Sequence, residues 1–432
     1  MLLDFTVENF RSIKGAETLS AVAANKSKSK ANNSESRRRV KSDDEIAQPF
    51  HVEGWDIDVL PVVAIFGANA SGKSNILKAL DYLLKFMAFG DEDRGSDLIP
   101  FKLDKKSRVS PSSFSLRTIF DGTIYNYRLV LNNTRIISEN LEYSLSSTKR
   151  SRLLYSRTWN EASQKFDWKS GADFSGAHNQ LRKKLKDREP FISIFSKLEI
   201  EVIEPFVTWF MVHRLVGSNL GHQKSDIKVI NFMLGEQPTL DVSQKLSEIL
   251  EITKNLLLKF DTGLYDIEIR QNETNERDYQ IYALHKIDDE VISWEFEEES
   301  MGTQKLFGLV CRILFTILLN SIATADELGS NIHPNITHEI VKLYQSHTTN
   351  PRRNQLIFTS HDNTLQRNNL LRRDQIWFTQ KRPDQSTELY SLSDFKVRND
   401  LAIDKAYLDG RFGAVPFISD EDDFMPVGED NG

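Results

Sequence analysis

Hydrophobic and polar residues alternate in several short segments of the chain, which is the pattern of strands that bury one face. The alternation begins at 2–10 and returns in "SSFSLRTIF", "TIYNYRLVLN" and "RIISENLEYSL" between 112 and 145. Asp121-Gly122 and Asn132-Asn133 separate these three segments and are residue pairs that favour tight turns. The pattern therefore predicts an N-terminal strand and an antiparallel β meander.

Uninterrupted apolar runs predict elements that are buried on both sides. Val62–Phe66 has the length of a buried strand, and a helical period continues from Asn75 to Phe86. The apolar segment 306–325 reaches the length of a membrane span, but Arg312 and Asn320 interrupt it. We interpret it as a core helix followed by a core strand.

The same mixture of strands and helices continues in the C-terminal half. A helix is predicted from about Pro334 to Ser346, before the strand "QLIFTS". Strand patterns occur in "LYDIEIR", "DYQIYALHK" and "VISWEFEEE", whereas the spacing between 173 and 259 is mainly helical. We therefore predict an α/β protein. Its four parts are an N-terminal lobe (1–172), a helical insertion (173–259), a C-terminal lobe (260–415) and an acidic tail (416–432).

Two segments lack apolar periodicity and carry mostly one sign of charge. Residues 26–41 contain seven basic residues and one acidic residue, and the tail segment "SDEDDFMPVGEDNG" is acidic. For the basic segment, a solvated loop and a contact with a phosphate backbone or a partner both remain open. For the acidic segment, a solvated tail and docking onto a basic partner both remain open.

The composition is that of a soluble globular protein with an ample core, since 39% of the 432 residues are hydrophobic and 27% are charged. The 55 Lys and Arg against 62 Asp and Glu give a net charge of −7, which excludes coating of nucleic acid through bulk charge. The single cysteine, Cys311, excludes a disulfide framework and a cysteine-rich zinc site, and it favours a cytoplasmic location. Asp4 and Glu8 argue against a secretory signal at the start.

A phosphate-binding loop is indicated between the strand at 62–66 and the following helix, where residues 67–74 match G-x-x-x-x-G-K-[ST]. In such a loop, backbone N–H groups turn inward onto phosphate and the helix N-terminus adds its positive dipole end. Lys73 would reach the β- and γ-phosphates, and Ser74 would offer its hydroxyl to Mg²⁺. A glycine-rich turn without a ligand is the alternative. The predicted nucleotide-binding residues are Gly67, Asn69, Ser71, Gly72, Lys73, Ser74 and Asn75.

Three further segments carry groups that can act on a nucleotide. Asp326-Glu327 ends a strand and offers one carboxylate for the Mg²⁺ water shell and one to polarise an attacking water. Ser300 and Gly302 begin an apolar helix, whose free N–H groups would point at an anion. His361 ends an apolar strand and could hydrogen-bond a γ-phosphate. Each segment has an ordinary alternative. Asp326-Glu327 could be surface charge, Ser300 and Gly302 could belong to an ordinary capped helix, and His361 could be a structural histidine.

The order of these four segments resembles that of ATP-binding-cassette (ABC) type ATPases of the RecF, structural-maintenance-of-chromosomes (SMC) and overcoming-lysogenization-defect group. More narrowly, "FTVENFRSI", "IFGANASGKSN", "DELGSNIHP", "QLIFTSHD", "RRDQIWFTQK", "LYSLSDFKVR" and "YLDGRFGAVPFI" are similar to segments of the bacterial AAA15 ATPase family, over nearly the whole chain. The resemblance implies an α/β ATPase head of ABC type, with the meander and an inserted helical subdomain. That family is known from abortive-infection and restriction-linked defence operons, with a separate effector that is often a Toprim-like nuclease.

The resemblance also implies roles for single residues, in a homodimer or higher assembly that closes around ATP. Ser300, Gly302 and Thr303 would face the γ-phosphate bound to Lys73 of the other subunit. Glu327 would be the catalytic base, Asp326 the Mg²⁺-water ligand and His361 the switch histidine, and 329–331 would lie between the two sites. Asn9 and Arg11 would lie near the phosphates. Relatives use a glutamine to touch Mg²⁺, yet no Gln occurs from Asn75 to Glu161, so we expect slow hydrolysis.

We therefore expect a cytoplasmic ATPase of an anti-phage defence system, which responds to a trigger such as a phage protein and controls a partner effector. No segment of the sequence has a recognisable nuclease centre, so any damaging activity would belong to the partner. A RecF-like DNA-repair ATPase that binds DNA directly is the alternative, and the basic segment 26–41 is its best support. A nucleotide-binding scaffold without turnover is a third possibility.

Overall fold

The computed structural model describes most of the chain. The described residues are 1–24, 49–90, 98–174, 179–197, 200–216, 251–260, 263–271, 279–318, 322–330, 332–367, 370–398 and 401–416. The basic segment 26–41, residues 417–432 of the acidic tail and 217–250 of the helical insertion, which the sequence singled out, lie outside the described residues.

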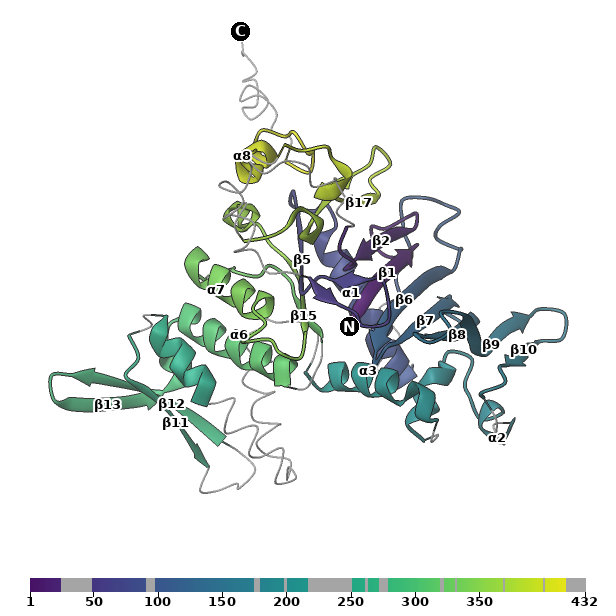
Figure 1. Ribbon diagram of the computed structural model, residues 1–432, viewed down its shortest axis with the longest axis horizontal. Helices are drawn as coiled ribbons and strands as arrows, with labels where there is room; N and C mark the ends of the chain where they lie inside the picture. Colours follow the sequence, from purple (N-terminus) through teal and green to yellow (C-terminus); the bar gives the residue numbers. More distant parts are fainter. Residues whose placement is uncertain are drawn as a thin grey trace, which may run out of the picture.

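A five-stranded sheet lies at the centre of the molecule (Figure 1), with the strand order β14-β15-β5-β16-β17. Its strands are β14 (Ile322–Ala325), β15 (Gln355–Thr359), β5 (Val62–Gly67), β16 (Ile376–Lys381) and β17 (Thr387–Ser391). The first four strands run parallel, and β17 pairs antiparallel with β16. Every residue of β5 is buried, as its apolar run predicted. Strands from both ends of the chain therefore form one sheet.

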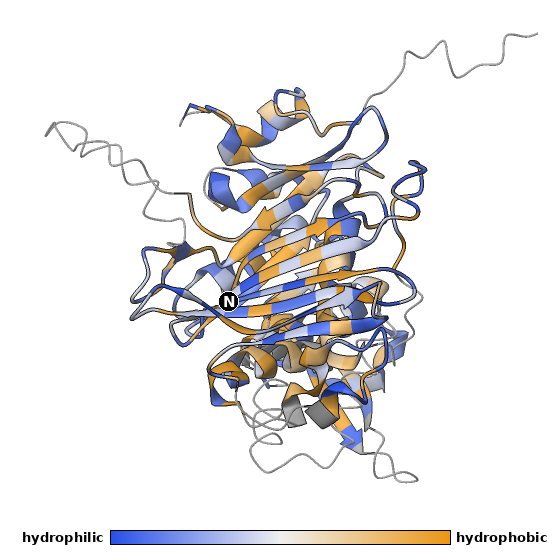
Figure 2. Ribbon diagram, turned by 90° about the vertical axis from the view of Figure 1, so that its right-hand side faces the viewer, coloured by the Kyte–Doolittle hydropathy of each residue, from blue (hydrophilic) through white to orange (hydrophobic). Residues whose placement is uncertain are grey.

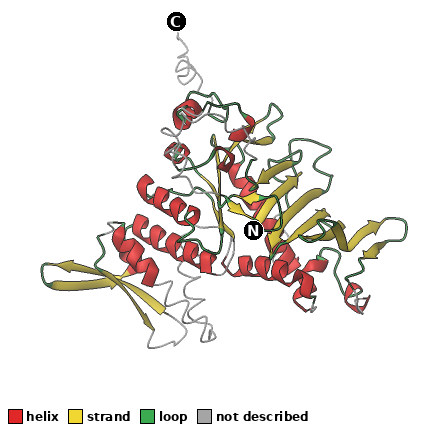
Figure 3. Cartoon of the chain, viewed as in Figure 1, coloured by secondary structure: helices red, strands yellow, loops and turns green. Residues whose placement is uncertain are grey.

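Helices cover both faces of this sheet (Figure 3). They are α1 (Lys73–Phe89), α6 (Met301–Leu318), α7 (Pro334–Gln345) and, near the C-terminal end of the described chain, α8 (Ile403–Leu408). Since alternate residues of a strand point to opposite faces, Val63 and Ile65 of β5 join the core that contains α1. Val62, Ala64 and Phe66 join the second core, which contains α6 and α7. The expected α/β core is confirmed.

The described part of the chain contains no helix with both the length and the apolar character that crossing a lipid bilayer requires. The apolar segment 306–325 divides between α6 and β14, as the interpretation of a core helix followed by a core strand predicted, and Arg312 lies within α6. Cys311 is buried in α6, which agrees with its apolar sequence context.

A second, seven-stranded sheet is antiparallel and has the order β10-β9-β8-β7-β6-β1-β2. Its strands are β1 (Leu2–Glu8), β2 (Glu17–Ser20), β6 (Ser112–Phe120), β7 (Thr123–Leu131), β8 (Ile136–Leu145), β9 (Ser151–Asn160) and β10 (Lys165–Ser170). The predicted meander is confirmed, and its strands alternate in hydropathy (Figure 2). The sequence analysis did not predict β9 or β10, and β10 is mostly exposed with mainly polar residues.

Two small sheets complete the described strands. One pairs β3 (Phe50–His51) with β4 (Asp58–Val59). The other contains β11 (Asp266–Gln271), β12 (Tyr279–Ile287) and β13 (Glu290–Glu295), which agree with the three strands predicted between 264 and 299. Short 3-10 helices connect several elements, at Phe191–Lys197, Glu201–Ile203, Phe296–Glu298, Asn363–Gln366, Arg373–Gln375 and Leu392–Asp394.

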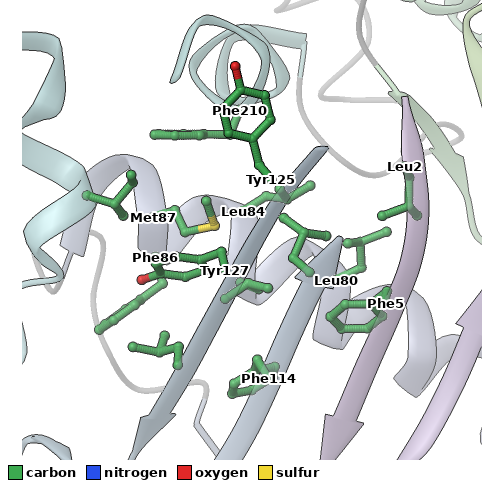
Figure 4. Packing of buried hydrophobic residues seen from close by; sticks show 14 of the residues in the cluster. Leu2, Phe5, Leu80, Leu84, Phe86, Met87, Phe114, Tyr125, Tyr127 and Phe210 are labelled. Atoms are coloured by element: carbon green, nitrogen blue, oxygen red, sulfur yellow. The ribbon is translucent and has the colours of Figure 1, made fainter. Parts of the chain in front are cut away.

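The described part of the helical insertion packs into the N-terminal core. It contains α2 (Asn179–Arg182), the 3-10 helix 191–197, α3 (Glu204–Val216) and helical residues 251–259. Phe210 of α3 lies over α1 and the meander (Figure 4), and the ring of Phe206 stacks on Tyr125 with centroids 5.2 Å apart. α3 therefore completes the apolar core between α1 and the meander.

A buried ion pair fixes the 3-10 helix 191–197 to the meander. Glu139 of β8 and Arg157 of β9 have no exposed side-chain surface, and their charged groups lie 2.7 Å apart. The Glu139 carboxylate also accepts hydrogen bonds from the hydroxyls of Tyr127 and Tyr155 and from the backbone N–H groups of residues 191 and 192. Burial raises the pKa of both tyrosines well above the ordinary value, so they stay protonated and donate.

Candidate functional site

The loop 67–72 connects β5 to α1, where the sequence predicted a phosphate-binding loop. Gly67 and Gly72 have positive φ angles of 151° and 110°. A Cβ atom at Gly67 would lie 2.4 Å from the Thr379 carbonyl oxygen, and one at Gly72 would lie 2.0 Å from Thr387 Oγ1. Only glycine fits at these two positions, because the loop packs directly on β16 and β17.

Lys73 is the first residue of α1 and is buried within this loop. Its ammonium group donates hydrogen bonds to the carbonyl oxygens of Gly67 at 2.8 Å and Ala68 at 3.0 Å. Burial lowers the pKa of Lys73, while the nearby carboxylates of Glu327 and Asp326 act in the opposite direction. The loop therefore holds a cation at its centre, where a phosphate group would sit.

Ser74 and Asp326 bring the phosphate loop together with the strand β14. The Ser74 hydroxyl donates to Asp326 Oδ1 at 2.8 Å, and the Thr359 hydroxyl donates to the same oxygen at 2.7 Å. Mg²⁺ prefers oxygen ligands, and a hydroxyl beside a carboxylate supplies such ligands. The donor set therefore fits Mg²⁺, which Ser74 and Asp326 would hold.

Glu327 and His361 lie at the same edge of the central sheet. Glu327 has a positive φ of 55°, and its N–H donates to Thr359 Oγ1 at 2.7 Å. About half of its side chain is exposed, and its Oε1 lies 4.0 Å from His361 Nε2. Burial is the main cause that lowers the pKa of His361, followed by the positive charge of Lys73. A strained backbone that projects an acidic side chain towards a neutral imidazole is typical of a functional site.

The structure thus brings together the side chains that the sequence predicted from three separate segments. Lys73 interacts electrostatically with Asp326 and with Glu327, and all three act on His361. Parallel strands explain this arrangement, because the carboxyl ends of β5, β14 and β15 meet at one edge of the sheet.

Three hydroxyl residues that the sequence did not predict support the loop. Thr387 Oγ1 donates to the carbonyl oxygen of Ser71 at 2.8 Å and is 2.7 Å from Ser12 Oγ. Ser12 Oγ also accepts a hydrogen bond from Asn75 Nδ2 at 2.7 Å. Thr379 Oγ1 lies 2.6 Å from Ser71 Oγ, and both side chains are buried. Ser12 and Thr387 are 375 positions apart, and no local pattern in the sequence links them.

Ser300 caps the start of α6. Its hydroxyl accepts a hydrogen bond from the Thr303 N–H at 3.1 Å and lies 2.9 Å from the Thr303 hydroxyl. Gly302 and Thr303 line a cavity of about 620 Å³ together with His333 and other residues near the start of α7. Asn331, in the loop expected between two sites, lies outside the described residues. Whether Ser300, Gly302 and Thr303 complete a partner's nucleotide site stays a prediction.

The remaining predicted residues are Asn69, Asn9 and Arg11. Asn69 is exposed at the tip of the loop 67–72. Asn9 is buried, and its side-chain amide donates to the carbonyl oxygens of Ser107 and Ser110 and accepts from the Phe101 N–H, so it supports the loop 101–111. Arg11 precedes Ser12, and its guanidinium lies 5.5 Å from the centre of the Phe10 ring. A phosphate contact of Arg11 stays a prediction.

Comparison with known proteins gives one family match. Residues 62–367, more than half of the chain, match the model of the family described as "AAA domain, putative AbiEii toxin, Type IV TA system". The match begins with β5 and ends beyond His361, so it includes the phosphate loop, Asp326 and Glu327. A search of curated proteins finds no significant match.

Among solved structures, the chain is similar to the SmcHead bound to the C-winged helix domain of ScpA. The sequences are 13% identical, 94% of this chain and 99% of that chain are covered, and the TM-score is 0.48. It is also similar to the Smc head domain with an extended coiled coil bound to the C-terminal domain of ScpA derived from Pyrococcus furiosus. There the identity is 12%, the covered shares are 95% and 98%, and the TM-score is 0.39. Sequence identities and TM-scores this low do not assign the function of either structure to this chain.

Proposed function

Because this chain belongs to the family described as AAA domain, putative AbiEii toxin, type IV TA system, we propose that it binds and hydrolyses ATP. The observation that carries this proposal is the hydrogen bond from Ser74 to Asp326, which places the phosphate loop and a strand-end carboxylate at one site. Glu327 and His361 at the same edge add a base and a hydrogen-bonding group.

In this proposal each residue of the site has a distinct role. Backbone N–H groups of 67–72 and the ammonium group of Lys73 hold the β- and γ-phosphates. Ser74 and Asp326 hold Mg²⁺, which neutralises phosphate charge when it is bound. Glu327 orients the attacking water and accepts its proton. His361 donates a hydrogen bond to the γ-phosphate, and its lowered pKa keeps the imidazole neutral near pH 7.

The test is a measurement of phosphate release and ATP affinity in Glu327→Gln. General-base catalysis contributes roughly 10²–10⁴-fold, so turnover should fall at least about 100-fold while ATP still binds. Glu161→Gln, an exposed position in the turn between β9 and β10, is the matched control and should keep wild-type turnover. Unchanged phosphate release in Glu327→Gln would instead favour a nucleotide-binding scaffold without turnover.

The cellular role belongs to the same proposal. The ATPase acts in the cytoplasm of bacteria in an abortive-infection type of anti-phage defence, as in the AAA15 family that the sequence resembles. It forms a homodimer around ATP, responds to an infection trigger and controls a separate effector, such as a Toprim-like nuclease. The words "AbiEii toxin" and "Type IV TA system" in the family description support this role. Copurification of the product of a toxic neighbouring gene is the corresponding test.

A RecF-like DNA-repair ATPase is the second candidate. The basic segment 26–41, with seven basic residues and one acidic residue, favours it. Direct binding through phosphate contacts would weaken steeply with salt, because each neutralised phosphate releases a counterion. Tight duplex binding by the purified protein with a steep salt slope would favour repair, whereas absence of binding at low salt would favour defence.

A further inference from the structure

Three cationic side chains border a cavity of about 540 Å³ near the C-terminal end of the described chain. They are Lys396, Arg398 and Arg411, and all three are exposed. Within the part of the chain that the structure describes, none of them forms an ion pair or a side-chain hydrogen bond, and no acidic side chain lines the cavity. We call this cavity and its three cations the basic groove. Its positive charge has no partner of opposite sign among the described residues that line it.

Apart from the three cations, the lining of the basic groove is apolar and held in place by packing. Phe395 and Phe412 meet edge to face with ring centroids 5.4 Å apart, and Leu401 adds aliphatic surface. Phe412 also stacks on Phe378 of the central sheet, at 5.8 Å between centroids.

Hydrogen bonds fix the backbone on two sides of the basic groove. The Tyr390 hydroxyl donates to the carbonyl oxygen of Phe412 at 2.6 Å. The Arg373 guanidinium donates to the carbonyl oxygens of Val397 and Arg398, each at 2.7 Å. A fixed groove that combines apolar surface with cations suits a peptide that carries both carboxylates and an apolar side chain.

The chain itself contains a segment with this chemistry. Asp420, Glu421, Asp422 and Asp423 are followed directly by Phe424 and Met425, and 417–432 contains no lysine or arginine. The described chain ends at Pro416, five positions after Arg411 of the basic groove. An extended chain covers up to roughly 3.5 Å per residue, so Asp420 can lie up to roughly 14 Å from Pro416 and reach a groove that Arg411 and Phe412 line.

We propose that the basic groove binds the chain's own segment 420–425, with its carboxylates against Lys396, Arg398 and Arg411 and Phe424 on the apolar lining. The short connection raises the effective concentration of the segment at the groove, so weak individual contacts suffice. A nucleic acid would use the cations but leave the apolar lining without a role. The segment of a second copy would bind with the same contacts but only at higher protein concentration.

The proposal is tested on the full chain with a glutamate-specific protease, by following cleavage after Glu421 with mass spectrometry. Bound segment resists cleavage, so wild type should be cut slowly at low salt. Each exposed ion pair contributes little by itself, so the loss of all three in Lys396→Glu/Arg398→Glu/Arg411→Glu should speed cleavage about tenfold. Lys405→Glu, an exposed cation of α8 that does not line the groove, is the matched control and should be cut at the wild-type rate.

Exchanging the charges of the groove and the segment tests whether the substitutions change cleavage through binding of the segment or through an indirect effect. Adding Asp422→Lys and Asp423→Lys to the triple variant should restore slow cleavage, although the same two changes alone should speed it. Phe424→Ser should also speed cleavage, because it removes the apolar contact.

Equal cleavage rates in wild type and the triple variant would overturn the proposal. So would protection that grows with protein concentration, since that result indicates a second copy. Oligonucleotide binding that the triple variant loses without any change in cleavage would overturn it in favour of a nucleic acid.

Discussion

His361 Nε2 lies 4.0 Å from Glu327 Oε1, so these two candidate site residues face each other at the edge of the central sheet. Their contact is too long for a hydrogen bond, which leaves room for both groups to turn towards a γ-phosphate and a water. The charges around His361 come from two segments, with Lys73 of α1 lowering its pKa and Glu327 and Asp326, which follow β14, raising it.

This arrangement predicts how the pKa of His361 responds to its neighbours. Lys73→Met should raise the pKa of His361, and Glu327→Gln should lower it further, as NMR titration of the imidazole protons would show. Lys78→Met, on the exposed face of α1, should leave the pKa of His361 unchanged.

The pKa of His361 in the folded protein lies below the ordinary histidine value, so the unfolded chain binds the imidazole proton first as the pH falls. His361 therefore destabilises the fold as the pH falls from the ordinary histidine range through its folded pKa, and has no such effect above that range.

Lys73→Ala should strongly weaken ATP binding. A hydrogen bond to a charged group contributes about 1.5–3 kcal/mol, so the affinity should fall by roughly 10- to 100-fold or more. Isothermal titration calorimetry with ATP and Mg²⁺ measures this loss. Lys78→Ala removes an exposed lysine from the same helix and should bind ATP as wild type does. Equal affinity of Lys73→Ala and wild type would contradict the phosphate-loop assignment.

Thr387→Val should weaken the phosphate loop without changing its charge. The substitution leaves the Ser71 carbonyl oxygen without the hydrogen bond from Thr387 and costs about 1–3 kcal/mol of unfolding free energy. Urea denaturation gives this loss, and ATP affinity should fall as well. Thr6→Val is the matched control, since its hydroxyl pairs with Thr18 at an exposed position. A loss of the same size in both variants would show that the loop contact has no special role.

Glu139→Gln should be among the most destabilising single changes in the meander. It leaves the buried Arg157 without its carboxylate and turns two amide hydrogens towards groups that already donate, at a cost of about 3–5 kcal/mol. Chemical denaturation should show this shift, whereas Glu142→Gln, whose carboxylate accepts from an exposed Ser151, should change stability little. Similar stability of the two variants would rule out an energetic role for the buried pair.

Mixed dimers test whether two subunits share each ATP site. Lys73→Ala and Ser300→Arg subunits should each be inactive alone. In an equal mixture, half of the dimers are mixed and each keeps one intact site, so about a quarter of wild-type ATPase activity should return. The measurement is phosphate release after verified subunit exchange. No recovery would mean that Ser300 acts outside a shared site.

Local patterns in the sequence predicted most of the elements that build the candidate site. The apolar run of β5, the glycines of the loop and the helical period of α1 are consecutive, and each follows from the residues themselves. Asp326 and His361 were predicted because each follows a short apolar strand. Parallel pairing of those strands then places their ends together, and this follows from fold class alone.

The supporting contacts were not predictable in the same way. Thr379 and Thr387 lie on β16 and β17, and only the packing of those strands against the loop gives their hydroxyls a function. β10 escaped prediction for a different reason, because only Phe166 and Trp168 alternate with polar residues in this short edge strand, and four of its six residues are exposed. The ion pair of Glu139 and Arg157 shows that charged residues can lie in a core when every acceptor has a donor, which composition does not reveal.

The position of β5 between β15 and β16 has a consequence for synthesis on the ribosome. The loop emerges early, but both strands that flank β5 are made only after the greater part of the chain has left the exit tunnel. A nascent chain that has not yet released β15 and β16, or a product truncated before them, therefore lacks both strands that hold β5 in the sheet.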